Sequence, residues 1–192
     1  MPLDRQECLS NARKDVARNS KCQSIGGTDI PVCGQATRHS MNGQRINKKT
    51  RNLPHWTLDG SVYFVTFRLA QGSLSHEERS IVLQHLGSGD QQFYILAAAV
   101  VMPDHVHLLL KPILPYDLSR IMKGIKGVSA RKINVHRKSS GTIWQDESWD
   151  RIVRDAGEFD EKLQYMADNP VEAELVRQIE DYPYWYCDKE LL

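Results

Sequence analysis

The chain has 192 residues, of which 41% are hydrophobic and 26% charged, a composition that supports a folded core and excludes wholesale disorder. Its formal net charge is +1, and its four cysteines are too few for a disulfide-rich mini-protein. No run of about 18 apolar residues is present, and residues 1–20 are too polar for a secretory signal. We therefore expect a soluble cytoplasmic protein.

The first part of the chain differs in composition from the rest. Residues 1–50 are rich in small polar and basic residues and sustain no helical or strand period. Their three cysteines, Cys8, Cys22 and Cys33, form no C-x2-C pair and have no histidine at a zinc-finger offset. We interpret residues 1–44 as a flexible leader or an upstream start, and residues 45–192 as the functional domain.

From Ser61 onward the pattern predicts regular elements. Residues 61–69 are β-branched and aromatic, which predicts a strand. Ser75 and Glu78 form a capping box that opens a helix ending at Gly87. A continuously apolar second strand over 93–101 and a third over 105–111 are joined by a short Pro-Asp turn, which predicts a hairpin.

The second half is predicted to hold a long helix, two short strands and two further helices. Their expected positions are Asp117 or Ser119 to Ser140–Gly141, Trp144, 151–154, 158–168, and a short helix from Pro170. This order indicates an α+β protein with a ferredoxin-like split βαβ fold. We expect an antiparallel sheet with helices on one face, and a C-terminal helix that bears Tyr165.

Charge is segregated along the chain. Residues 118–145 contain seven basic and no acidic residues, whereas residues 146–192 contain five basic and fourteen acidic ones. A one-sign stretch in a near-neutral chain is typical of a local site for a polyanion, but a solvated helix face gives the same pattern. The seven residues are Arg120, Lys123, Lys126, Arg131, Lys132, Arg137 and Lys138.

A pair of histidines lies on the third predicted strand. His105 and His107 are two residues apart, so they point to the same face, while Val106 and Leu108 point to the other. Parallel imidazoles are a common half-site for a metal, although strand histidines can also be ordinary cross-strand groups. Position 109 is leucine, which argues against a histidine-triad hydrolase, and no His-Glu-x-x-His zinc protease motif is present.

A tyrosine and an asparagine share one face of the later helix. Tyr165 and Asn169 are four residues apart, so the phenol and the amide oxygen project together. A tyrosine beside an oxygen ligand suits nucleophilic attack near a metal-bound phosphate. The alternative is that Tyr165 is a half-buried core aromatic.

These motifs together resemble a known family. Residues 100–110, VVMPDHVHLLL, resemble the His-hydrophobic-His (HUH) signature of the IS200-like single-tyrosine transposases. Residues 165–176 resemble the tyrosine helix of the REP-associated branch, and residues 53–56, 63–68, 126–134 and 144–154 are similar to it as well. Glu174 and Trp149 depart from the family pattern, which has glycine and a smaller aromatic there. The resemblance covers about residues 45–185.

The resemblance implies an activity and a set of site residues. It implies a metal-dependent single-stranded DNA endonuclease and strand transferase that forms a covalent 5′-phosphotyrosine. Tyr165 matches the nucleophile, His105 and His107 match the catalytic metal-binding pair, and Asn169 matches the third metal ligand. The expected cofactor is a divalent metal, Mg²⁺ or Mn²⁺, and zinc is an alternative in purified protein.

The resemblance also implies contacts with single-stranded or hairpin DNA. We expect the phosphate backbone to contact the basic helix and two further arginines, that is, Arg120, Lys123, Lys126, Arg131, Lys132, Arg68 and Arg154. An unpaired base is expected to stack on His55, Trp56 or Trp144, although a tryptophan in a small domain is more often a core residue. A homodimer is left open. So is the alternative that the chain is a domesticated, non-catalytic nucleic-acid-binding protein that keeps the transposase fold.

Overall fold

The computed structural model describes residues 46–50, 54–58 and 60–188, with side chains from residue 60 onward. Strands β1 (Ile46–Thr50) and β2 (Pro54–Leu58) pair with each other as an antiparallel hairpin. The interpretation of residues 1–44 as a leader, and the side chains of His55 and Trp56, lie outside the described residues. Within the described part, no helix is long and apolar enough to cross a membrane.

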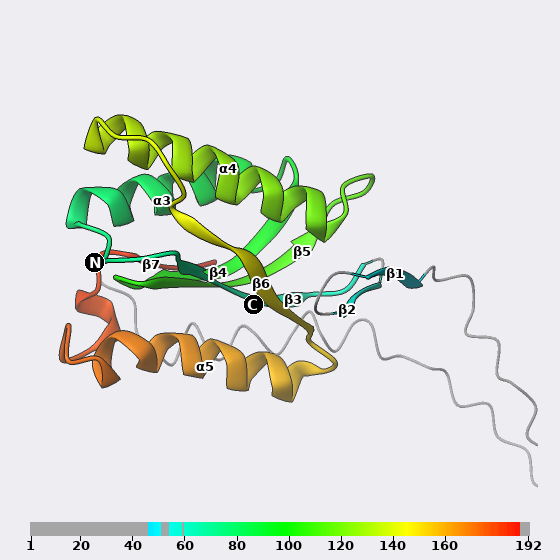
Figure 1. Cartoon of the computed structure of the whole chain (residues 1–192). Helices are drawn as coiled ribbons and strands as arrows, with labels where there is room; N and C mark the ends of the chain where they lie inside the picture. Colours follow the sequence, from blue (N-terminus) through cyan, green and yellow to red (C-terminus); the bar gives the residue numbers. More distant parts are fainter. Residues whose placement is uncertain (1–45, 51–53, 59, 189–192) are drawn as a thin grey trace, which may run out of the picture.

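The main body is a five-stranded antiparallel sheet between two layers of helices (Figure 1). The strand order is β6-β3-β5-β4-β7. The strands are β3 (Tyr63–Leu69), β4 (Tyr94–Val101), β5 (His105–Pro112), β6 (Trp144–Ile152) and β7 (Trp185–Cys187). The helices are α3 (His76–Gly89), α4 (Leu118–Arg137), α5 (Ala156–Glu172) and the short 3-10 helix η2 (Ile179–Asp181).

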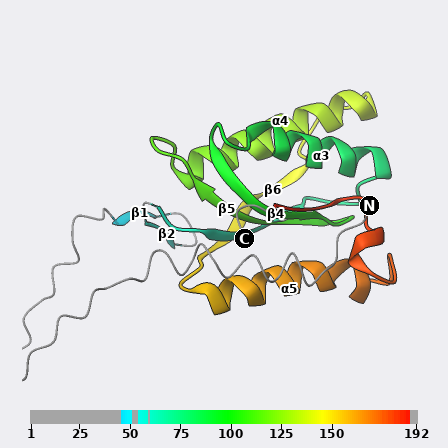
Figure 2. The same ribbon diagram turned by 180° about the vertical axis from the view of Figure 1, so that it is seen from behind.

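This architecture confirms the predicted ferredoxin-like α+β fold. The order β3-α3-β4-β5-α4-β6 is the split βαβ pattern, with β5 between the parallel pair β3 and β4. Helices α3 and α4 share one face of the sheet, as expected, and the tyrosine-bearing helix α5 covers the opposite face (Figures 1 and 2). Because the central strands are covered on both sides, their sequences are almost continuously apolar.

Helix ends follow the capping residues that the sequence provides. Ser75 and Glu78 form the predicted capping box of α3, and the carboxylate of Asp117 accepts from the backbone of α4. Asp155 does the same for α5, which therefore begins two residues earlier than expected, at Ala156.

Several elements differ from the prediction. The hairpin of β1 and β2 was not predicted, because no strand period was found before Ser61. Strand β6 is one strand of nine residues rather than two short ones. Its pairing with β3 shifts register between Trp144 and Ser148, and this irregularity accommodates the polar residues between them within a single strand. Pro170 lies inside the last turn of α5 and does not start a new helix, since few helical hydrogen bonds remain to be lost there. Beyond it, Glu174 has a left-handed φ of 55°, which explains the glycine of the family pattern.

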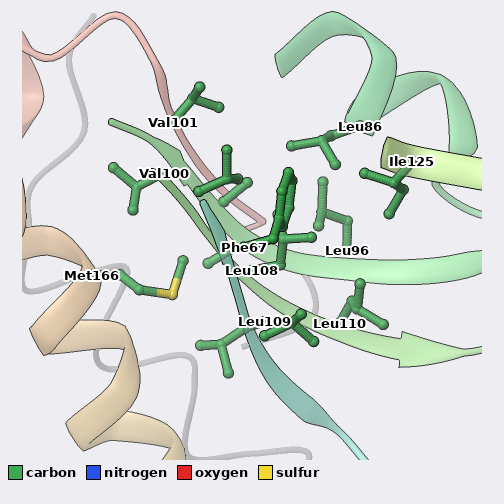
Figure 3. Packing of buried hydrophobic residues seen from close by; sticks show 14 of the residues in the cluster. Phe67, Leu86, Leu96, Val100, Val101, Leu108, Leu109, Leu110, Ile125 and Met166 are labelled. Carbon is green, nitrogen blue, oxygen red and sulfur yellow. The ribbon is translucent and has the colours of Figure 1, made fainter. Parts of the chain in front are cut away.

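The core lies on both faces of β5. Val106, Leu108 and Leu110 are fully buried on the face covered by α3 and α4, which contribute Leu86 and Ile125. Figure 3 shows Met166, from α5, on the other side of the sheet. A slip of β5 by one residue would turn His105 and His107 into the apolar core under α3 and α4, so this packing fixes the register of the strand.

Two residues that the sequence analysis considered for DNA binding, Trp144 and Arg137, make hydrogen bonds within the protein instead. Trp144 is 4% exposed and its indole Nε1 donates to Ser129 Oγ at 2.9 Å, so the expectation that it stacks on a base is wrong. Arg137 makes two hydrogen bonds to the buried carboxylate of Glu78, at 2.5 and 2.8 Å, and ties α4 to α3. The Arg137 hydrogen bonds hold the pKa of Glu78 below its ordinary value, against the effect of burial.

Candidate functional site

The two predicted histidines lie side by side at the centre of the sheet, facing α5. Pairing with β3 places His105 opposite Arg68 and His107 opposite Thr66. The two imidazole centroids are 4.6 Å apart. The residue His107 is 3% exposed, and the side chain of His105 is 12% exposed, so both rings are largely shielded from water.

Each imidazole has a partner on its Nδ1 atom. The carboxylate of Asp104 lies 2.7 Å from Nδ1 of His105, and the hydroxyl of Thr66 lies 2.7 Å from Nδ1 of His107. A proton on Nδ1 satisfies each contact and leaves the lone pair of Nε2 available. The Nε2 atom of His107 is buried and makes no hydrogen bond. Partners of this kind orient histidines that bind metals.

Asn169 brings an oxygen to the same place. Its Nδ2 donates to the backbone carbonyl of Tyr165 at 2.7 Å, and this carbonyl can only accept. The amide oxygen Oδ1 is therefore the atom that faces Nε2 of His105, at 3.4 Å. The helical spacing that the sequence indicates thus places Asn169 beside the histidine pair.

The three inner atoms suit a divalent cation. In the described part of the chain, no group of three or more His, Cys, Asp or Glu side chains is arranged to hold a metal. The site instead combines two imidazole nitrogens with one amide oxygen, all of them acceptors when the Nδ1 atoms carry the protons. Acceptors that face one another in a buried place are costly unless a cation or proton lies between them. Such nitrogen and oxygen ligands accept Mn²⁺, Mg²⁺ or Zn²⁺.

Tyr165 lies beside this group but remains open to solvent. Its ring centroid is 5.3 Å from that of His107, and the residue is 48% exposed. The buried Phe64 stacks on His107 at 5.3 Å and meets the Tyr165 ring edge-on at 6.1 Å. Tyr165 is thus about half buried, as the alternative interpretation expects, but its ring packs beside His107 and Phe64 at the site.

His107 is held in its neutral form. Burial lowers its pKa from 6.5 to about 3, and the nearby charges of His105 and Arg68 act in the same direction. A neutral imidazole is the form that binds a metal, so no proton has to be removed at physiological pH.

The residues expected to contact DNA fall in three places. Arg68 is next to the histidines, with its guanidinium 3.5 Å from the carboxylate of Asp104. Arg154 pairs with the buried Glu158 at 2.9 Å at the start of α5. The five basic residues of α4 are on the opposite face of the sheet: Arg120, Lys123, Arg131 and Lys132 are exposed, and Lys126 donates to the backbone of Asp146 at 2.7 Å.

Three residues of the site were not identified from the sequence. Asp104 directly precedes His105, and this adjacency is a usable signal. Thr66 and Phe64 come from β3, about 40 residues upstream of the histidines, so only the register of β3 on β5 brings them to the site.

Comparisons with known proteins agree with the fold and the motifs. The family model described as "Transposase IS200 like" matches residues 72–154, which include the histidine pair but not α5. A Haemophilus influenzae protein named REP-associated tyrosine transposase is 28% identical over 144 residues, or 65% of this chain and 78% of that protein. The REP-associated tyrosine transposase of Escherichia coli is 30% identical over 88 residues, or 45% of this chain and half of that protein.

A solved structure shares the fold. It is a REP-associated tyrosine transposase bound to a REP hairpin, with a TM-score of 0.61 and 21% identity. The match covers 71% of this chain and 82% of that one.

The first prediction concerns the protonation of His107. In metal-free protein its imidazole should stay neutral from about pH 8 to about pH 5, because burial disfavours the charged ring. The unfolded chain takes up this proton below about pH 6.5, so stability should fall as the pH drops towards the lowered pKa. Imidazole ¹⁵N NMR, assigned with a His107→Gln variant, measures the protonation directly. A titration midpoint near 6.5 would show that the ring is not desolvated.

Proposed function

This chain belongs to the IS200-like transposase family, and on that premise we propose that it is a metal-dependent single-stranded DNA endonuclease and strand transferase. The observation that supports this most is the meeting of His105, His107 and Asn169 beside Tyr165. A protein that had only kept the fold for binding would not need an oriented set of acceptors next to an exposed tyrosine.

The proposed reaction is a transesterification at phosphorus. The phenol oxygen of Tyr165 attacks the scissile phosphate and forms a 5′-phosphotyrosine bond while the bond to the 3′ oxygen breaks. The phenol proton ends on the released 3′ hydroxyl, so atoms and charge balance. A second 3′ hydroxyl can then displace the tyrosine without ATP, because the phosphotyrosine keeps the energy of the original bond.

The remaining site residues prepare this attack. His105, His107 and Asn169 would hold a divalent cation, Mg²⁺ or Mn²⁺, whose charge stabilises the oxygens of the scissile phosphate when it is bound. Asp104 and Thr66 fix the two imidazoles from behind. Phe64 sets the position of the Tyr165 ring against His107.

DNA would engage both faces of the sheet. Helix α4, which carries the exposed basic residues, and helix α5 lie on opposite faces of the sheet (Figure 2), so the sheet separates α4 from the tyrosine-bearing helix. We infer that α4 holds the backbone of a hairpin stem, while the adjoining single strand reaches Tyr165 on the other face. The hairpin-bound relative described above supports a substrate of this kind.

The second prediction tests the nucleophile. Tyr165→Phe removes only the hydroxyl, so the melting temperature should change little while cleavage and the covalent adduct disappear. The assay is incubation of the full chain with hairpin-bearing single-stranded DNA and Mn²⁺, followed by a denaturing gel. Tyr186→Phe, on β7, is the matched control and should retain both activities. An adduct that persists in Tyr165→Phe means that another residue is the nucleophile.

The third prediction tests the metal ligands and their supports. His105→Ala and Asn169→Ala should each strongly weaken Mn²⁺ binding measured by calorimetry, because each removes one inner acceptor. Thr66→Val keeps the shape but loses the contact to His107, and should weaken binding by about tenfold. His136→Ala, at the exposed end of α4, should change nothing. Equal Mn²⁺ affinity in all four variants would refute the shared site.

The fourth prediction tests the basic face of α4. Replacing Arg120, Lys123, Arg131 and Lys132 by glutamine should weaken DNA binding to a similar degree for all sequences. The slope of log affinity against log salt should become shallower by about 0.9 for each lost contact to a duplex stem. Arg177→Gln, an exposed arginine elsewhere, serves as a single-charge control. An unchanged slope would identify α4 as a solvated face only.

A further inference from the structure

A second exposed aromatic lies beside the site. Trp149 is on the edge strand β6, where pairing with β3 places it opposite Thr66, on the face that carries the histidines. Its ring meets Phe64 edge-on at 5.8 Å, just as Tyr165 meets Phe64 from α5. Trp149 and Tyr165 are 46% and 48% exposed. One buried phenylalanine thus supports two half-exposed rings next to the imidazoles.

The exposure of Trp149 is not required by the strand. Trp144, at the other end of β6, is 4% exposed and packs edge-on against Phe67 at 4.8 Å. Trp149 instead leaves nearly half of its surface in water, where it gains nothing for folding. A large exposed aromatic at a reaction site is typical of a surface for a flat apolar ligand.

A cation adjoins the same phenylalanine. Lys162 precedes Tyr165 by three residues in α5, so both side chains project from neighbouring positions on one helix face. Its ammonium nitrogen is 5.7 Å from the Phe64 ring centroid. Among the described residues no carboxylate forms an ion pair with Lys162, so its charge remains available to an anion.

We propose that Trp149 and Lys162 form a nucleotide subsite beside Tyr165, in which the indole stacks on an unpaired base and the ammonium contacts the adjoining phosphate. This deepens the proposed function and rests on it, because the bound strand is the one that Tyr165 would cleave. Stacking accepts any base, since every base has a π-face. The subsite therefore holds the strand in place without selecting its sequence.

The test measures binding to Tyr165→Phe protein, which keeps the ring but cannot cleave. The probes are a fluorophore-labelled single-stranded oligothymidylate and a strand of equal length with abasic residues, both read by fluorescence anisotropy. Trp149→Ala should weaken binding of oligothymidylate by about tenfold, a loss typical of one stacked base, and leave the abasic strand unaffected. Trp149→Phe should retain most of the affinity.

Lys162→Gln should weaken both strands equally, because both keep their phosphates, and should flatten the salt dependence by about 0.7. Phe93→Ala is the matched control, a 41% exposed aromatic in the turn just before β4 that should change neither affinity. Melting temperatures of all variants report folding independently of DNA.

Three results overturn the subsite, two of them obtained with the Trp149→Ala variant. One is a Trp149→Ala variant that binds both strands like its parent, and the other is an equal loss on both strands, which would mean only a distorted fold. A parent that does not bind oligothymidylate overturns it as well. By contrast, a wild-type chain that forms no adduct but shows binding dependent on Trp149 refutes the nuclease and leaves the subsite standing.

Discussion

The site depends on the fixed register of β5. This strand is paired along its length with β3 on one side and β4 on the other, and its alternate residues are buried under α3 and α4. Slipping by one residue would turn His105 and His107 into the apolar core and move Val106 and Leu108 to the face under α5. The packing that stabilises the fold therefore also determines the face of the sheet to which the two imidazoles point.

Helix α5 carries the other two site residues, Tyr165 and Asn169, and its own buried side chains hold it against the sheet. Met166 and Leu163 bury one side of the helix against the sheet, and this orients Tyr165 and Asn169 towards the histidines. The amide of Asn169 is then fixed by the helix backbone rather than by a partner across the site. Acceptors from two elements thus meet without a proton donor between them, which is the condition that favours a cation.

Much of this was predictable because it is local. The period of two on a strand places His105 and His107 together, and the period of the helix does the same for Tyr165 and Asn169. Their meeting depends on the packing of α5 against β5, two segments about 60 residues apart, and only the family resemblance indicated it. For the same reason Phe64, Thr66 and Trp149 were not identified as site residues.

Charged residues were the hardest to interpret from the sequence. Seven basic residues in one stretch look equivalent, yet Arg137 is committed to the buried Glu78 and Lys126 to the backbone of β6. Arg154 likewise pairs with Glu158, a partner four residues away that the helical spacing could have indicated. Whether a charge is free or paired depends on burial of its partner, and composition does not report burial.

The most direct test of the central claim is the location of a metal ion in the protein. Crystals of the full chain soaked in Mn²⁺ and measured at a wavelength with strong manganese anomalous scattering would give its position. We predict a single strong peak between Nε2 of His105, Nε2 of His107 and Oδ1 of Asn169, next to the ring of Tyr165. A strong peak at the Asp104 carboxylate alone, or none near the imidazoles, would contradict the account.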